Sequence, residues 1–377
     1  MINSEILEIR KQFKHENSSI TKFSGCYVDG EKVIKTKFTE TFLCMPEEET
    51  FKYFEIFKKT LSGTIGKNLI NMEFPTETEF NGGTQQFLLN LRDSELKDEA
   101  LLDEFYEKVI QSYDFVGNYL ILLIYAAYDV PGKTNDKIMM DDASDEVYRF
   151  ILCSICPVKL SKPGLSYNED SNAIQKRIQD WVVGTPINGF LFPAFHERST
   201  DIHNVLYYAK ESEDLHSDFV DQLLGCTLPM SAGGQKETFQ TLIVETLGEE
   251  CEYEIVKNIH DKLNEIIEEH KMKEIPEPLT LDKMEVKNLF AESGVEEEKL
   301  QEFERNYEKV AGENVALLAA NVASTRVFEV KTPDVVVKVN PERTELVQTK
   351  MVDGRRCLVI EITDQVEVNG INVKPGC

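Results

Sequence analysis

Long hydrophobic runs are scarce in this sequence. The longest spans about a dozen residues, whereas a helix that crosses a membrane needs roughly 20. The first residues, MINSEILEIRKQFKH, are polar and contain no apolar stretch followed by a small-residue cleavage site. We therefore predict a cytoplasmic protein that has neither a membrane-spanning helix nor a secretory leader.

Positive charge is also in short supply. The 377 residues include 41 Lys and Arg against 67 Asp and Glu, which gives a net charge of -26. So acidic a balance repels nucleic acids and anionic membranes over most of the surface, although it does not exclude a local basic patch. Residues 249–313 alone hold 20 acidic and 9 basic side chains, a net of -11, in a pattern with helical periodicity.

The signature motifs of large enzyme families are missing. The chain contains neither a nucleophile elbow nor a kinase signature, and HExxH is absent because Arg-Ser-Thr-Asp follows His196-Glu197. Our leading hypothesis is therefore a non-enzymatic interaction or binding protein that has a protein partner and requires no cofactor.

Disulfides and metal clusters are not expected either. The eight cysteines are scattered through a long chain, which is typical of reduced thiols. Cys153-x-x-Cys156 lies inside an apolar segment, has no second CxxC to complete a metal site, and would direct its two thiols to opposite faces of a strand. We predict two buried small hydrophobic residues here and no metal site.

The apolar residues that are present point to an α+β fold. Two runs, 118–129 (NYLILLIYAAYD) and 147–158 (VYRFILCSICPV), flank a polar segment and predict a long antiparallel hairpin at the centre of a mixed core. We expect two or three domains, built from an α+β core over 1–248, an acidic helical segment over 249–325, and a small antiparallel β domain over 326–377.

Several local patterns predict further elements. Ser199 or Thr200 could cap a helix over 201–210, and 173–183 has the pattern of a short helix. A helical pair is expected over 281–292 and 296–311. Asp353-Gly354 and Asn369-Gly370 are typical of type I′ turns between the strands of the last domain.

The densest run of chemically active side chains is HERSTDIH, which contributes His196, Arg198, Asp201 and His203. It follows an apolar segment, where loops often carry function. His196 could act as a base, and Arg198 could bind a carboxylate or a phosphate. The alternative is structural, with Arg198 paired to a neighbouring acid and the histidines on the surface. An enzyme using this loop is one of our alternative hypotheses.

A second candidate combines two glycines with nearby lysines: Lys58, Lys59, Gly63, Gly66 and Lys67. Two residues separate the glycines and Asn68 follows the lysine, so the segment does not fit a phosphate-binding P-loop. It could be a GxxG clamp on a nucleic-acid backbone, or a glycine-rich helix stop with solvated lysines. The loop SAGGQK, which ends at Lys236, likewise allows either anion binding or an ordinary turn.

Seven longer runs carry a resemblance to a known family: FKYFEIFKKTLSGTIGKNL, AAYDVPGK, CSICPVKLSKPGLSY, GFLFPAFHERSTDIH, LGCTLPMSAGGQKETF, VKTPDVVVKVNPERT and QVEVNGINV. They resemble a bacterial family that is numbered 4317 among domains of unknown function and is common in anaerobic Firmicutes. The resemblance spans the whole chain, implies a cytoplasmic bacterial protein and supplies no activity.

The order of elements is also similar to that of the bacterial nucleoid-associated protein family. This likeness includes an "LYY … LLGC" stretch, here 206–208 and 223–226. It implies an association with DNA or with DNA-bound machinery, and it assigns no site residues. Weak nucleic-acid binding is thus a further alternative, although the acidic charge argues against tight binding because each neutralised phosphate needs a cation.

Overall fold

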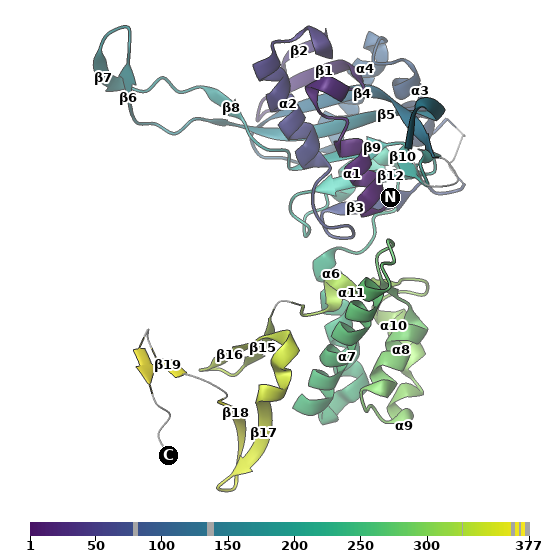
Figure 1. The fold of residues 1–377 in the computed structure, drawn as a ribbon, viewed down its shortest axis with the longest axis vertical. Helices are drawn as coiled ribbons and strands as arrows, with labels where there is room; N and C mark the ends of the chain where they lie inside the picture. Colours follow the sequence, from purple (N-terminus) through teal and green to yellow (C-terminus); the bar gives the residue numbers. More distant parts are fainter. Residues whose placement is uncertain (78–81, 134–138, 326, 363–365, 369–370, 374–377) are drawn as a thin grey trace. The chain divides into compact units, whose positions relative to one another are not determined.

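The computed structural model separates into two compact units, Met1–Ser231 and Ala232–Cys377 (Figure 1). It describes the whole chain except residues 78–81, 134–138, 326, 363–365, 369–370 and 374–377. Helix α6, Ala232–Leu247, lies in the second unit, whereas we expected residues up to 248 to belong to the first domain. Among the described residues, no helix has both the length and the apolar composition required to cross a bilayer.

One antiparallel sheet organises unit 1 and confirms the α+β class. Its strand order is β2-β1-β4-β5-β9-β12-β3, and β8 pairs with β5 beside this path. Its strands are β1 Ile20–Val28, β2 Ile34–Thr41, β3 Leu69–Glu73, β4 Asn118–Lys133, β5 Met139–Leu160, β8 Trp181–Val183, β9 Asn188–Phe192 and β12 Asn204–Ala209.

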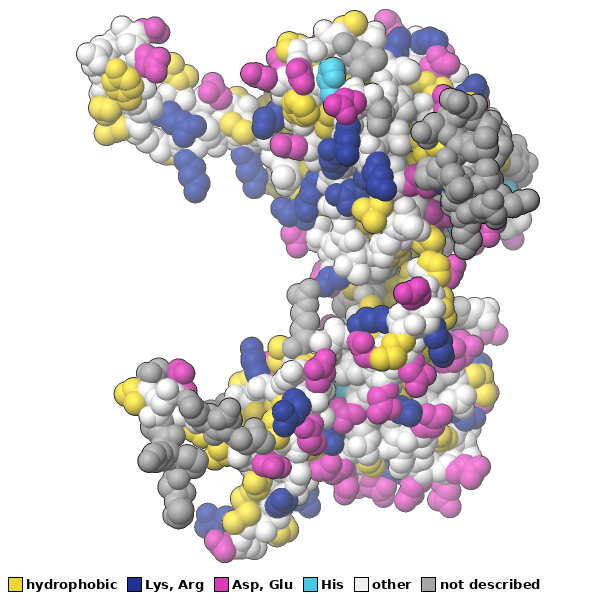
Figure 2. Space-filling model, viewed as in Figure 1, with side chains coloured by type: hydrophobic (Ala, Val, Ile, Leu, Met, Phe, Trp, Pro, Cys, Tyr) yellow, Lys and Arg dark blue, Asp and Glu magenta, His cyan; other side chains and the backbone are white. Residues whose placement is uncertain are grey.

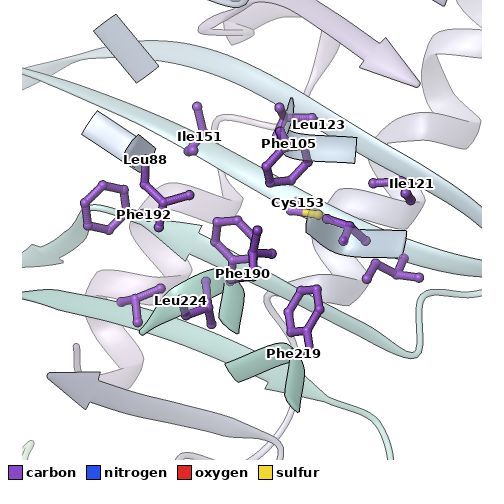
Figure 3. Close-up of a cluster of buried hydrophobic side chains, with 14 of the residues drawn as sticks. Leu88, Phe105, Ile121, Leu123, Ile151, Cys153, Phe190, Phe192, Phe219 and Leu224 are labelled. Atoms are coloured by element: carbon purple, nitrogen blue, oxygen red, sulfur yellow. The ribbon is translucent and has the colours of Figure 1, made fainter. Parts of the chain in front are cut away.

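The predicted central hairpin is confirmed as β4 and β5, which pair from Asn118↔Val158 onward. Residues of β4 alternate between two buried clusters: Tyr119, Ile121 and Leu123 belong to one, and Leu120 and Leu122 to the other. A strand that is covered on both faces has no solvent side, which explains why its sequence is apolar at nearly every position. Figure 3 shows part of the first cluster, including Ile121 and Leu123.

Helices cover both faces of this sheet. Apolar side chains of α1 and α2 join the cluster that holds Leu120, whereas those of α3, α4 and α5 join the cluster that holds Ile121. The helical segments are α1 Asn3–Arg10, η1 His15–Asn17, η2 Phe42–Cys44, α2 Glu47–Thr60, α3 Thr84–Asp93, α4 Glu99–Ser112, α5 Ser217–Phe219 and the π-helical turn η3 Val220–Leu224.

The cysteine pair behaves as predicted from strand geometry. Cys153 and Cys156 are fully buried, and they belong to different clusters on opposite faces of the sheet. Burial raises the pKa of the Cys156 thiol to about 12 and raises that of Cys153 further. Both thiols therefore act as small apolar side chains in this core.

Helices with a shared apolar core make up most of unit 2. Phe239, Leu263, Phe290 and Phe303 are among the buried residues that hold them together. The predicted helical pair is present, but its second helix is divided at Gln301 and Glu302. The elements are α6 Ala232–Leu247, η4 Gly248–Glu250, α7 Tyr253–Met272, β13 Thr280–Leu281, α8 Lys283–Glu292, α9 Glu297–Leu300, α10 Phe303–Val310, β14 Leu317–Leu318 and α11 Ala319–Val322.

The end of unit 2 consists of hairpins. We expected one small sheet or meander, but the described strands form three separate two-stranded ladders. Asp353 and Gly354 both have positive φ, as a type I′ turn requires, whereas Asn369-Gly370 lies outside the described residues. The elements are β15 Phe328–Lys331, β16 Val336–Val339, η5 Pro341–Leu346, β17 Val347–Val352, β18 Arg355–Ile360, β19 Val366–Val368 and β20 Ile371–Val373.

Two predicted helices in unit 1 are wrong. Residues 173–183 form strands β7, Ala173–Lys176, and β8, and residues 201–210 contain the end of β11, Ser199–Asp201, and all of β12. Strand β12 pairs with β9 on one side and β3 on the other, so its apolar run fills the interior of a sheet. Pairing on both sides outweighs the local helical pattern.

Candidate binding site

A two-stranded ribbon extends beyond the sheet of unit 1, and residues 158–184 of this ribbon are here called the arm. At its base β5 pairs with β8 through Val158↔Val183 and Leu160↔Trp181. At its far end β6, Leu165–Asn168, pairs with β7. Backbone hydrogen bonds join the part between: Ser161 N donates to the Asp180 carbonyl at 2.8 Å, and Arg177 N donates to the Gly164 carbonyl at 2.9 Å. Figure 1 shows the ribbon running from β8 to β6 and β7.

The two faces of the arm differ in chemistry. Residues paired across an antiparallel ladder lie on the same face, and alternate residues share a face. At the tip, one face therefore carries Leu165, Tyr167 and Ile174, while the other carries Ser166 and Gln175. At the base, the same rule groups Leu160, Trp181 and Val183 on one face.

These apolar side chains are exposed. Tyr167 retains 57% of its accessible surface, Ile174 retains 65% and Trp181, the chain's single tryptophan, retains 56%. A two-stranded ribbon is marginally stable alone in water, and contiguous exposed apolar surface is typical of an interaction site. Figure 2 shows hydrophobic side chains together with Lys and Arg on the arm.

A groove of about 410 Å³ lies where the arm meets the body of unit 1. Helix α2 contributes Tyr53 and Ile56 to its wall, strand β4 contributes Leu120, and the segment after β8 contributes residues 184–186. Val183 belongs both to this wall and to the apolar face at the arm's base. The groove therefore continues the apolar surface of the arm, with the carboxylates of Glu49 and Glu55 among its lining.

The arm also carries four exposed cations: Lys159, Lys162, Lys176 and Arg177. Within the described chain, none of them forms an ion pair. In the helical part of unit 2, by contrast, most lysines contact a carboxylate, as Lys283 does with Glu308 at 2.5 Å. Unpaired cations beside exposed apolar groups favour a partner surface that combines apolar side chains with carboxylates.

The loop with His196, Arg198, Asp201 and His203 forms a tight hairpin between β10, Ala194–His196, and β11, Ser199–Asp201. Glu197 and Arg198 occupy its turn with positive φ. No helix begins here, which contradicts the cap predicted at Ser199 or Thr200.

The polar groups of this hairpin tie it to the rest of unit 1. Arg198 donates to Glu8 of α1 at 2.8 and 3.0 Å and to the Pro131 carbonyl at 2.6 Å. His196 Nδ1 lies 3.6 Å from Glu5, whose carboxylate also accepts from Glu197 N at 2.7 Å. This geometry favours a structural role for the hairpin in holding α1.

The polar side chains of this loop do not share a common set of partners. The Asp201 carboxylate bonds to residues that follow it closely in the chain: it accepts from His203 N at 3.0 Å and from the side chain of Asn204 at 2.8 Å. The bonds of Arg198 lead instead to α1 and to Pro131. The expected site therefore divides into two separate sets of structural bonds.

The second predicted site lies at the end of α2. Lys58 and Lys59 occupy the last turn of this helix, and the Lys58 ammonium lies 6.0 Å from the centre of the Phe54 ring. Gly63 and Gly66 both have positive φ and shape a turn that leads into β3, rather than a link between two helices. Lys67 is exposed at this turn.

Sequence reasoning missed the arm as a site. The alternation in LSYN, residues 165–168, was available as a signal, together with the apolar residues of the AIQK and WVV segments. Lys162-Pro163-Gly164 indicated an interruption of the preceding strand, and the single tryptophan, Trp181, follows within the same segment. Alternation predicts a two-faced strand, but it does not state whether the apolar face is covered by the same chain.

Comparison with known families gives one match. The model of the family described as a domain of unknown function, DUF4317, matches residues 1–371 and so covers nearly the whole chain. A search of curated proteins returns no match.

Proposed function

We propose that this chain, which belongs to the DUF4317 family, is a non-enzymatic binding protein that docks a partner protein on the exposed apolar side chains of its arm. The amphipathic arm carries this proposal. Six large apolar side chains, those of Leu160, Leu165, Tyr167, Ile174, Trp181 and Val183, are each at least 40% exposed on the faces defined above.

The residue types on the arm suit protein recognition. Trp, Tyr and Arg dominate the energetically important positions of protein interfaces, and the arm presents Trp181, Tyr167 and Arg177. Covering one large apolar side chain contributes about 1.5–3 kcal/mol of gross burial energy. The unpaired lysines favour a partner whose apolar strip is bordered by Asp and Glu.

A matched pair of variants tests this proposal. Tyr167→Asp/Ile174→Asp and Ser166→Asp/Gln175→Asp each place two carboxylates at one cross-strand pair, the first on the apolar face of the tip and the second on its polar face. Each full-length variant is used to capture partners from the source cells, and each captured protein is purified and titrated against both variants. We expect the first variant to lose at least about tenfold in affinity, or 1.4 kcal/mol, and the second to bind as the unaltered chain does.

Trp181 provides a direct reading of the same event. Because it is the only tryptophan, its emission comes from the arm alone. A partner that covers the apolar side chains at the arm's base removes water from the indole ring and shifts the emission to shorter wavelength. Equal binding by both double variants would reject docking on the apolar face of the tip, and a complex that leaves the emission unchanged would reject docking at the base.

Nucleic acid is the second candidate partner, and the exposed cations support it. Lys59 and Lys67 at the end of α2 are exposed and, among the described residues, form no ion pair. If they contact phosphates, duplex DNA should bind at low salt, and Lys59→Glu or Lys67→Glu should each reduce the salt dependence by about one unit. Lys271→Glu, which alters a lysine that already pairs with Glu268 at 2.6 Å, is the control. Fluorescence anisotropy that detects no binding at low salt would exclude this candidate.

A further inference from the structure

A cavity of about 590 Å³, open to solvent, lies in unit 2 between helices α6 and α7 and the β15–β16 hairpin. This volume is within the range of pockets that hold small molecules. Apolar and aromatic side chains, among them Tyr253, Val256 and Phe328, form a large part of its wall.

The charge of this cavity is opposite to that of the unit around it. Residues 232–377 carry 18 basic and 30 acidic side chains, a net of -12. The cavity lining includes three lysines, Lys236, Lys331 and Lys338, and one carboxylate, Glu329, a net of +2. Lys338 lies 3.7 Å from Glu329, whereas Lys236 and Lys331 form no ion pair in the described part of the unit.

A partly buried imidazole adds a polar group to this wall. The His260 ring packs against Phe328, with centroids 6.0 Å apart, and against Phe239 at 6.4 Å. Its Nδ1 atom is buried and has no hydrogen-bond partner among the described residues. Buried polar atoms are nearly always satisfied, so an unsatisfied one beside a cavity indicates room for a further polar group.

From these observations we propose that the cavity binds a small organic anion, in which a phosphate or carboxylate is attached to a flat or apolar body. The anionic group pairs with Lys236 and Lys331, and the body lies against Tyr253, Phe328 and the neighbouring valines. An anion supplies the charge that these two lysines lack, and an apolar body covers wall surface that water would otherwise contact.

Calorimetric titration of the full chain with three probes tests this assignment. Benzyl phosphate carries both features, inorganic phosphate carries only the anion, and benzyl alcohol carries only the body. We expect saturable binding of benzyl phosphate and at least about tenfold weaker binding of the other two. Absence of saturable benzyl phosphate binding would overturn the proposal, and equal binding of inorganic phosphate would overturn its apolar part.

Two charge-reversal variants locate the binding. Lys331→Glu alters the cavity, whereas Lys350→Glu alters an exposed lysine on β17 that does not line it. Both change one strand lysine of a hairpin in unit 2, so they are matched in charge and setting. We expect Lys331→Glu to weaken benzyl phosphate binding at least about tenfold and Lys350→Glu to leave it unchanged. Equal affinities for the two variants would place the probe elsewhere and reject the site.

Discussion

Strand β5 passes through two regions, the sheet and the arm, in which large apolar side chains are buried in the first and exposed in the second. At Ile151 and Ile155 it lies inside the sheet, and both side chains are fully buried. From Leu160, which is 45% exposed, it enters the arm. In the core, neighbouring strands and a layer of helices cover each face, whereas in the arm the single paired strand covers only one edge. The comparison shows that apolar alternation specifies a face to be covered, and that the surrounding layers decide what covers it.

The largest expected effect belongs to the core side of this comparison. Ile151→Ala removes buried methyl groups between two layers and should destabilise unit 1 by about 2–5 kcal/mol. Amide hydrogen exchange, followed by mass spectrometry on peptides of β4 and β9, measures this loss separately from unit 2. A loss below about 0.5 kcal/mol would contradict the two-sided burial of β5.

The His196–His203 hairpin provides an intermediate case between the buried core and the exposed arm, because its polar groups are partly covered. Arg198→Ala removes two bonds to Glu8 and one to the Pro131 carbonyl, so we expect unit 1 to lose about 1–3 kcal/mol of stability. His196→Ala, which alters a side chain that is 52% exposed, is the control and should cost less. Unchanged stability in Arg198→Ala would leave this arginine available for a ligand and revive the hypothesis of a functional loop.

His260 in unit 2 is a partly buried titratable side chain, so the comparison between covered and exposed side chains can be tested there by changing the pH. Burial lowers the pKa of His260 below its ordinary value of 6.5, and Lys236 lowers it further, against the opposing effect of Asp261. The unfolded state therefore binds a proton more readily than the folded state does. The stability due to neutral His260 is present above about pH 6.5 and is lost as the pH falls below it, by at most about 1.4 kcal/mol per pH unit.

Exchange of α7 peptides at pH 7.5 and pH 5 measures this dependence. We expect His260→Phe to reduce the acid sensitivity of α7. His216 in unit 1 provides an internal control, because burial also lowers its pKa and the substitution at His260 leaves it unaltered. Identical acid sensitivity of α7 in both proteins would show that His260 is not responsible.

The smallest expected effect lies on the arm. Ile174→Ala trims a side chain of the same type as Ile151, but one that is 65% exposed. Its stability change should stay within about 0.5 kcal/mol in urea-induced unfolding. A loss as large as that of Ile151→Ala would mean that the arm packs against its own chain, and would break the comparison.

Much of the fold could be predicted from periodicity, because elements covered on one or two faces leave a clear pattern. The hairpin of β4 and β5, the opposite placement of Cys153 and Cys156, and most helices of unit 2 follow from it. The prediction was wrong at β12, because a short apolar run of the kind in LYY fits a helix or an interior strand equally well. Only its pairing with β9 and β3, which are distant in the chain, decides between them.

The sites were harder to predict than the fold. Residue chemistry drew attention to Arg198 and allowed an ion pair with an acid, but its partner Glu8 lies 190 positions away in the chain, so the identity of that acid could not be anticipated. The arm was missed for a different reason. Whether an apolar strand face is exposed depends on the elements packed around the strand, which the sequence of the strand does not specify. The cavity in unit 2 brings together Lys236 and Lys331, which the sequence separates by most of the helical segment.

The burial of Cys153 and Cys156 has a practical consequence for chemical labelling. Cys44 in unit 1 and Cys251 in unit 2 are exposed, whereas burial raises the pKa of Cys26 to about 11 and that of Cys226 to about 12. Among the cysteines that the structure describes, a maleimide added to the folded protein should therefore reach Cys44 and Cys251 first. The buried thiols of unit 1 should react only when its sheet opens. Their alkylation rate would therefore report the rate of that opening without any engineered cysteine.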